Sequence, residues 1–266
     1  MLRSRIDWCD SSFNPVTGCY HECPYCYARG ISTRFKSRGE LIEPETHHLT
    51  GKDGREIIEC NEQPYIVNDG VMKKVAYPYG FIPTLHRYRL NEFKDKKGRN
   101  IFVGSMADLW GEWVPGRWLA EILRACENAP QHNYLFLTKN PARYEELNRY
   151  GELPTSENFW YGTTVTKPSD KFAFGWPYKN FVSIEPIHGD FGKVQGALLT
   201  NWVIIGAETG NRKDKIIPKR EWVQNIVDQC KERNIPVFMK SNLADVWGDD
   251  LIQEFPEQLG KLQNNR

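Results

Sequence analysis

YLFLTKNPARYEELNRYGELPTSENFWYGTTV, residues 134–165, contains two short apolar runs separated by a segment with the signals of a helix. The runs 134–138 and 159–165 are continuously apolar rather than alternating, which is typical of parallel strands buried on both faces. Between them, Asn140 is a suitable N-cap and Gly151 follows the last expected turn. The stretch is therefore predicted to form a strand–helix–strand unit.

The same alternation continues on both sides of this unit. Further apolar runs predict strands, and amphipathic segments predict helices at 116–129 and 219–234. Such a series favours a parallel sheet with right-handed crossovers, either an open doubly wound sheet or a closed or partial barrel. No strand is followed by a dinucleotide-binding or P-loop motif. The further predicted strands are 100–105, 181–185, 202–208 and 236–240.

Residues 36–99 interrupt the series and are interpreted as an insertion after the first helix. They are rich first in polar and turn residues, then in aromatic and basic ones. Long segments of this kind are commonly functional, which favours a lid over the rest of the domain. The sequence REIIECNEQPYIV (55–67) favours instead a β-hairpin that packs on the side. Both interpretations remain open.

Composition predicts a globular cytoplasmic protein. The chain has 266 residues, of which 40% are hydrophobic and 26% charged, and its formal net charge is +1. The net charge therefore gives no general attraction to nucleic acid or to an acidic membrane. No apolar run approaches the roughly 20 residues that cross a bilayer, and the first residues lack the apolar core of a secretion signal. In a reducing compartment, clustered cysteines favour metal binding or catalysis over disulfides.

The seven cysteines fall into two groups. Cys126 and Cys230 lie on apolar helical faces and are predicted to be core residues, since free cysteine packs like a small hydrophobe. Cys9 and Cys60 are isolated. Only three cysteines form a cluster, within the sequence GCYHECPYCYARG at 18–30: Cys19, Cys23 and Cys26.

The clustered cysteines are compatible with two kinds of metal site. A structural zinc ion requires four ligands, and His21 or Cys9 could supply the fourth. An iron–sulfur cluster is held by thiolates, and three thiolates would leave one iron of a 4Fe–4S cluster open. An open coordination position is typical of a catalytic metal site.

Each predicted strand after residue 100 ends in polar, reactive side chains. In parallel α/β folds ligands bind at the carboxyl ends of the strands, so six such endings would form one polar mouth. For any single strand, ordinary strand-to-loop polarity is the alternative. The residues concerned are Ser105 and Asp108, Thr138 and Lys139, Thr163 and Thr164, Ser183 and Glu185, Glu208 and Thr209, and Lys240 and Ser241.

The spacing C-x3-C-x-aromatic-C, with Tyr25 as the aromatic residue, resembles the motif of the radical S-adenosylmethionine superfamily. More of the chain resembles a phage-associated, three-cysteine-motif family, most of whose members have no known substrate. The match covers most of the chain apart from about residues 36–80, and it departs near Lys240, where MKSNLADVWG stands in place of an expected FKQWG. The matching blocks are WCDSSFNPVTGCYHECPYCYA, FVGSMADLW, LTKNPAR, WYGTTV, VSIEP, WVIIGAETG and VFMKS.

The resemblance implies one domain over residues 1–266, a partial (β/α)6-type TIM barrel that carries the 36–99 insertion. It implies that Cys19, Cys23 and Cys26 bind a 4Fe–4S cluster, whose open iron takes the amino and carboxylate groups of S-adenosylmethionine. An external one-electron reductant of the flavodoxin or ferredoxin type would reduce the cluster. Cleavage of the C5′–S bond would give methionine and a 5′-deoxyadenosyl radical, which would abstract hydrogen from an unknown substrate.

The resemblance also implies cofactor contacts. Tyr25 would lie beside the adenine, with a packing aromatic as the alternative. Ser105 and Asp108 follow the second strand, where the methionine amino group commonly binds, although GSMAD stands in place of the usual Gly-Gly-Glu. Four residues that end the fourth and fifth strands would contact the ribose and carboxylate: Thr163, Thr164, Ser183 and Glu185.

The implied catalytic residues are Lys139, Glu208 and Lys240, which would face the cofactor or substrate. The alternative is a ring of salt bridges that closes the mouth of the barrel. Because the other cysteines are scattered, a single cluster is expected.

Two other interpretations of the chain remain. One is a nucleic-acid modification or repair protein of the same fold, with a nucleic acid or nucleotide as substrate, favoured by the basic stretches RGISTRFKSR (29–38) and NRKDKIIPKR (211–220). The other is a zinc-stabilised protein without catalysis. No membrane partner is expected.

Overall fold

The computed structural model describes residues 4, 6–36, 39–170, 178–193, 200–210 and 212–263. Parts of both basic stretches, Ser37, Arg38 and Asn211, lie outside these ranges. The chain divides into two compact units. The barrel unit comprises Met1–Ser11, Gly98–Phe102 and Gln131–Arg266, and the cysteine unit comprises Ser12–Lys97 and Val103–Pro130.

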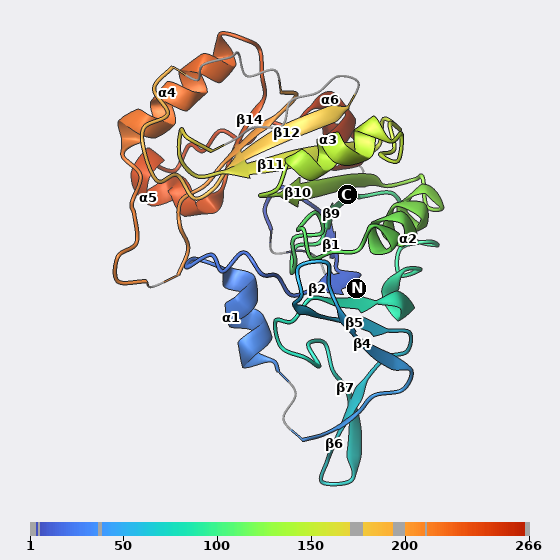
Figure 1. Ribbon diagram of the computed structural model, residues 1–266. Helices are drawn as coiled ribbons and strands as arrows, with labels where there is room; N and C mark the ends of the chain where they lie inside the picture. Colours follow the sequence, from blue (N-terminus) through green and yellow to red (C-terminus); the bar gives the residue numbers. More distant parts are fainter. Residues whose placement is uncertain are drawn as a thin grey trace. The chain divides into compact units, whose positions relative to one another are not determined.

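The central element is a curled seven-stranded parallel sheet that forms a half-barrel in an α/β fold (Figure 1). Six of its strands, β9 to β14, confirm the six predicted after residue 100. The seventh, β1, precedes residues 18–26, which carry the three clustered cysteines and are called the cysteine segment below. In sheet order the strands are β1 (Ser11–Phe13), β9 (Asn100–Val103), β10 (Asn133–Thr138), β11 (Phe159–Val165), β12 (Lys179–Ile184), β13 (Val203–Ile205) and β14 (Val237–Met239).

The three predicted helices are also present, as α2 (Gly116–Glu127), α3 (Ala142–Arg149) and α4 (Arg220–Lys231). The expected N-cap of α3 is wrong. Asn140 lies two residues before the helix, and its N–H donates to Thr138 Oγ1 at 2.9 Å. Pro141 occupies the N-cap position, and because its side chain has no acceptor atom, no side-chain hydrogen bond caps the helix.

Two apolar layers cover the faces of strands β11 to β14. One contains Val182, Val203 and the buried face of α4, including Cys230. Figure 1 shows α4 and α5 (Ala244–Trp247) along this part of the sheet. The opposite layer contains Phe181 and Ile204 and is rich in tryptophan and phenylalanine. Because neighbouring residues of a strand face opposite ways, the two layers tell which side chains share a face.

The remaining elements of the barrel unit are short. The 3-10 helix η2 (Ser241–Leu243) follows β14, and α6 (Glu257–Gln263) lies near the end of the described chain. No helix among the described residues is long and apolar enough to cross a membrane.

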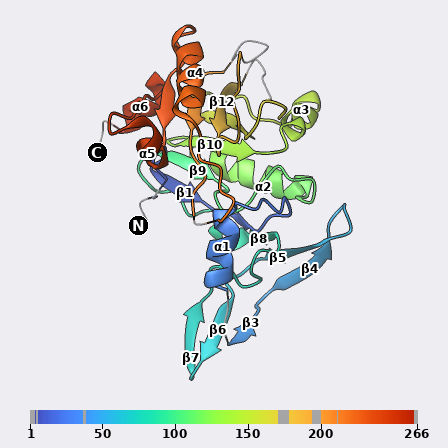
Figure 2. The same ribbon diagram turned by 90° about the vertical axis from the view of Figure 1, so that its left-hand side faces the viewer.

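The cysteine unit contains two small sheets (Figure 2). A four-stranded sheet has the order β2-β8-β5-β4, and a three-stranded sheet has the order β3-β6-β7. The helix α1 (Tyr27–Arg34) begins directly after the cysteine segment. The elements are β2 (Val16–Thr17), β3 (Glu40–Ile42), β4 (Thr46–Thr50), β5 (Glu56–Cys60), β6 (Tyr65–Asn68), β7 (Val71–Lys74), β8 (Thr84–His86) and the 3-10 helix η1 (Arg87–Arg89).

These sheets correct the hairpin interpretation of residues 55–67. The two strands of that stretch, β5 and β6, do not pair with each other. β5 pairs with β4 and β8, whereas β6 pairs with β3 and β7. The hairpin interpretation is wrong because each strand forms a hairpin with its other neighbour along the chain: β5 pairs with the preceding strand β4, and β6 pairs with the following strand β7.

Candidate functional site

The three clustered cysteines differ from the other four in exposure. Cys19, Cys23 and Cys26 form no disulfide and are partly exposed. The predictions for Cys126 and Cys230 are confirmed, since both are buried core residues. The remaining two, Cys9 and Cys60, are also buried. The partly exposed cysteines are therefore concentrated in the segment 19–26, which is where metal-binding chemistry was expected.

Backbone contacts fix the start of the cysteine segment. The Gly18 N–H donates to Met106 O at 2.9 Å, and the Cys19 N–H donates to Phe81 O at 3.3 Å. Gly18 has a φ of +91°, and a Cβ there would lie 2.3 Å from Ile82 O. Glycine is required because any side chain would overlap the neighbouring backbone and strain its own.

The third cysteine caps the helix that follows it. The Cys26 N–H donates to Cys23 O at 3.1 Å, and the Cys26 Sγ accepts the Arg29 N–H at 3.4 Å. This contact places the Cys26 sulfur against the first turn of α1.

The first thiol is held in its neutral form. Burial, and secondly the charge of Asp108, raise the pKa of the Cys19 thiol to about 12. A metal would have to displace this proton, because thiolate is the form that binds metals. Among the described residues, no three His, Cys, Asp or Glu side chains converge on a point that would hold a single ion. In a 4Fe–4S cluster each thiolate binds a different iron, so three soft donors in one short segment are chemically suited to that group.

The two proposed alternative ligands are both engaged elsewhere. Nε2 of His21 lies 2.7 Å from Oδ2 of Asp108, and its ring packs edge-on to Trp113. Cys9 belongs to the barrel unit, where it is buried and its Sγ lies 3.5 Å from Ser4 Oγ.

Ser105 and Asp108 lie beside the cysteine segment within the same unit. The Tyr27 hydroxyl donates to Ser105 O at 2.6 Å, and the Ser105 hydroxyl lies 3.1 Å from Asn14 Oδ1. Asp108 contacts His21 through one oxygen and accepts the Trp110 N–H through the other. Tyr25 is partly exposed in the turn before α1. The structure thus brings three of the predicted cofactor residues together with the cysteines.

The predicted residues of β11 and β12 are divided between two faces. Thr164 is the register partner of Ser183, and Ser183 is the partner of Ile204 in the aromatic layer. Thr163 pairs with Val182 of the opposite layer, so the side chains of Thr163 and Thr164 lie on opposite faces of the sheet. Ser183 is 1% exposed, and its Oγ has no hydrogen-bond partner among the described residues.

Glu185 and Lys240 meet at the carboxyl ends of β12 and β14. The Lys240 ammonium is paired with Glu185 Oε1. Between them, Gly206 leaves room for both side chains, because a Cβ there would lie 3.1 Å from carbons of each. The two predicted residues therefore contact each other directly.

Glu208 forms a second charged group at this edge. Its carboxylate is fully buried and accepts two hydrogen bonds from Arg212, at 2.8 and 2.9 Å. His188 Nε2 lies 3.4 Å from the same carboxylate. The Arg212 hydrogen bonds hold the pKa of Glu208 below its usual range. Lys139, directly after β10, is partly exposed. Glu208 and Lys240 each form an ion pair, as expected from the alternative interpretation in which salt bridges close the mouth of the barrel.

Sequence reasoning missed the aromatic and charged residues that surround the cysteines. Tyr20 lies inside the motif, so its position was a signal, but nothing in the sequence linked it to Arg55 or Trp113. Those contacts join segments that are far apart along the chain, and neither residue belongs to a recognisable pattern.

The fold and the site define a parallel α/β protein with a half-barrel sheet and a segment of three accessible thiols. The chain belongs to the family described as "Protein of unknown function (DUF5131)", which matches residues 3–262. No curated protein and no solved structure matches it.

Proposed function

We propose that this chain is a radical S-adenosylmethionine enzyme with a partial (β/α)6-type barrel, acting in the cytoplasm on a substrate of unknown identity. The single observation that carries the proposal is the segregation of the cysteines. Three accessible thiols lie within residues 19–26 in the spacing of the superfamily motif, while the other four are buried. A 4Fe–4S cluster bound there would supply electron transfer to the sulfonium of S-adenosylmethionine.

The residues of the chain would bind and orient the cofactors. Cys19, Cys23 and Cys26 would provide the thiolates, and the N-cap position of Cys26 would fix its sulfur at the start of α1. The buried hydroxyl of Ser183 supports a ligand at the edge of the barrel unit. An unsatisfied buried hydroxyl costs about 1–3 kcal/mol, and a ligand hydroxyl or amine would satisfy it.

The charged residues at the carboxyl edge of the barrel unit would face the cofactor or substrate. Lys240 and Glu185 neutralise each other, as do Arg212 and Glu208, so this edge carries little uncompensated charge. An acidic flavodoxin- or ferredoxin-type protein would deliver the electron. A substrate that exchanges hydrogen with 5′-deoxyadenosine would complete the reaction.

The test is reductive cleavage of S-adenosylmethionine. Protein reconstituted anaerobically with iron and sulfide, then reduced with dithionite, is expected to form 5′-deoxyadenosine and methionine. Alanine at Cys19, Cys23 or Cys26 should abolish both products, whereas Cys126→Ala should retain them, because Cys126 is a core residue of α2. Cleavage that survives any of the three cysteine substitutions would contradict the proposal.

A second candidate function is nucleic-acid modification or repair, favoured by the surface at the end of α1. Phe35 is 60% exposed between the exposed Arg34 and Lys36. Among the described residues, no carboxylate forms an ion pair with either of these two basic side chains. An aromatic ring flanked by cations can stack on a base and contact phosphate. Salt-dependent retardation of single-stranded DNA or RNA, lost in Phe35→Ala, would support this function; no retardation at low salt would reject it.

A further inference from the structure

The turn before β5, which belongs to the 36–99 insertion, contacts the cysteine segment through Arg55. The Arg55 guanidinium carbon lies 4.2 Å from the centre of the Tyr20 ring and 5.3 Å from that of Trp113. The two rings pack edge to face, with their centres 5.6 Å apart. A cation held over two aromatic faces stabilises their arrangement by about 0.5–2 kcal/mol for each good contact.

Asp53 fixes the orientation of the Arg55 side chain. Its Oδ2 accepts a hydrogen bond from Arg55 Nε at 2.8 Å and pairs with Nη2 at 2.6 Å, while Oδ1 accepts the Arg55 N–H at 3.0 Å. The guanidinium is planar, so this bidentate contact also sets the face that it presents to the rings. Lys52 lies in the same turn and is exposed.

Tyr20 is held at both ends of its side chain. Arg55 covers the ring, and the hydroxyl donates to Glu56 O at 2.6 Å, on the first residue of β5. Tyr20 occupies the interval between Cys19 and Cys23. The contacts of its ring and hydroxyl therefore restrain the backbone between the first two thiols.

Trp113 connects the same place to the loop after β9. Its side chain is buried, and its ring centre lies 4.9 Å from that of His21. His21 is in turn bonded to Asp108. Two consecutive residues between the first two cysteines, Tyr20 and His21, are therefore packed on one tryptophan.

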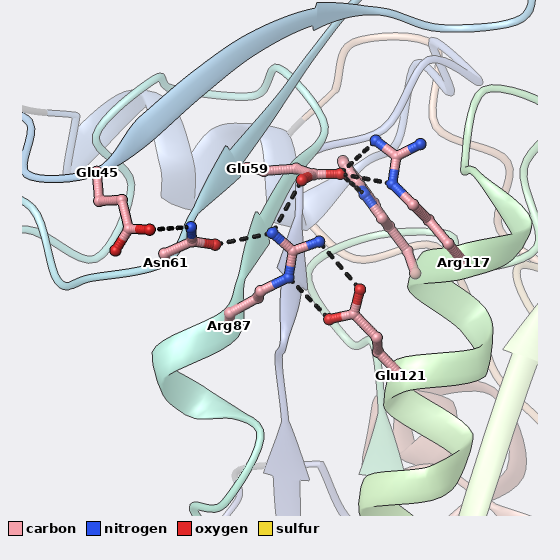
Figure 3. Close-up of polar contacts among 7 residues, drawn as sticks. Glu45, Glu59, Asn61, Arg87, Arg117 and Glu121 are labelled. Carbon is pink, nitrogen blue, oxygen red and sulfur yellow. Dashed lines mark hydrogen bonds and ion pairs between the residues drawn. The ribbon is translucent and has the colours of Figure 1, made fainter.

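The other end of β5 is anchored to α2 (Figure 3). The Glu59 carboxylate is 7% exposed and accepts hydrogen bonds from Arg117 and from the Trp118 indole, while Arg87 Nη1 lies 2.9 Å from its second oxygen. Arg87 also donates to both oxygens of Glu121, at 2.8 and 3.0 Å. β5 is thus fixed at one end by this network and contacts the cysteine segment at the other.

We propose that Arg55 and Tyr20 are positioning residues that hold the segment between Cys19 and Cys23 in its metal-binding conformation. In this role the insertion restricts the movement of the cysteine segment. The strand β5 connects that segment to the polar network on α2. The consequence for the cluster rests on the proposed function, whereas the conformational effect does not.

Hydrogen–deuterium exchange of the metal-free full chain tests the conformational effect. Arg55→Ala is expected to accelerate exchange of peptides covering 18–26 at least about twofold, because the lost contact is worth about 0.5–2 kcal/mol. Lys52→Ala removes the same charge from the same turn and should leave this exchange unchanged. Arg55→Lys should restore part of the protection, since an ammonium can also lie over the ring.

Tyr20→Phe separates the hydroxyl contact from the ring contact. It retains the face under Arg55 and loses only the bond to Glu56 O, so a smaller acceleration confined to the same peptides is expected. Exchange equal to that of the unchanged protein in both Arg55→Ala and Tyr20→Phe would overturn the proposal. An increase spread over all peptides of the cysteine unit in both variants would also overturn it, by showing a general structural role.

Iron retention distinguishes this inference from the proposed function. In reconstituted protein, Arg55→Ala should lose iron to a chelator faster than Lys52→Ala does. Iron loss at equal rates from the two variants would contradict the inference. If the unchanged protein takes up no iron, the proposed function fails, while the exchange experiment still decides whether Arg55 positions the segment.

Discussion

The thiols of the cysteine segment remain partly exposed, whereas the charged side chains at the carboxyl edge of the barrel unit are paired with one another. Cys19, Cys23 and Cys26 are positioned mainly through backbone contacts and through their neighbours. Glu185 and Glu208 each have a basic partner within the unit. The difference is that the cysteine segment keeps partly exposed sulfur-bearing residues, as the proposed ligand site requires, while Glu185 and Glu208 at the barrel edge already have basic partners.

Two glycine substitutions would sharpen this comparison most. Gly18→Ala should lower the free energy of unfolding by about 4 kcal/mol, because the left-handed backbone and the overlap with Ile82 O add together. Gly206→Ala should cost about 1 kcal/mol, since only the flexible ends of Glu185 and Lys240 must move. Urea unfolding measures both. Equal losses would show that the cysteine segment is no more tightly constrained than the barrel edge.

The attachment of β5 to α2 can be removed at the buried residue Glu59. Glu59→Gln should lower the free energy of unfolding by about 3 kcal/mol, because it leaves the Arg87 and Arg117 charges without their shared buried partner. Glu121→Gln is the control, since that side chain is 31% exposed and should cost about 1 kcal/mol or less. A Glu59→Gln protein as stable as the control would mean that the network in Figure 3 does not anchor β5.

The ion pair at the barrel edge can be tested with a double-mutant cycle. Lys240→Met should cost about 2 kcal/mol by leaving the Glu185 carboxylate unpaired in a largely buried place, and adding Glu185→Gln should recover about 1 kcal/mol. Urea unfolding of the four proteins gives the coupling. If Lys240 instead acts directly on the substrate, Lys240→Met will abolish turnover while the free energy of unfolding stays unchanged.

The smallest expected effect concerns acid stability. Hydrogen bonds from Arg212 lower the pKa of Glu208, and burial at Glu59 is outweighed by hydrogen bonds from Trp118 and Arg117 that lower its pKa too. A lowered folded-state pKa gives stability that is present above the unfolded value of about 4.3 and is lost as the pH falls through the folded value. Glu208→Gln should therefore flatten the fall in stability below about pH 4.5. An unchanged pH profile would contradict this ion pair.

The sequence predicted the sheet well because its signals are local. Continuous apolar runs indicated the six strands β9 to β14, and the alternation of strands and helices indicated their parallel arrangement. The pairing of β5 with β8 could not be predicted, since more than twenty residues lie between these strands, whereas the local pairs β4–β5 and β6–β7 could have been foreseen. The division of Thr163 from Thr164 follows from the period of a strand and could have been foreseen.

The candidate site was predictable only where spacing carries chemistry. The spacing of the cysteines at 19, 23 and 26 predicted them as donors and remains a prediction, whereas the burial of Cys126 and Cys230 followed from helical periodicity and is confirmed. The pairing of Glu208 with Arg212 was not foreseen, although the two are four residues apart. The contact of Arg55 with Tyr20 had no signal, because it depends on how the turn before β5 packs.

The central claim, that the three thiols hold a cluster with one open iron, is tested most directly by electron paramagnetic resonance of the reduced, reconstituted protein. The account predicts about four irons per chain and a spectrum that changes when S-adenosylmethionine is added, because the added molecule occupies the open iron. Two results would contradict it: tightly bound stoichiometric zinc, or a reduced cluster whose spectrum does not change when S-adenosylmethionine is added.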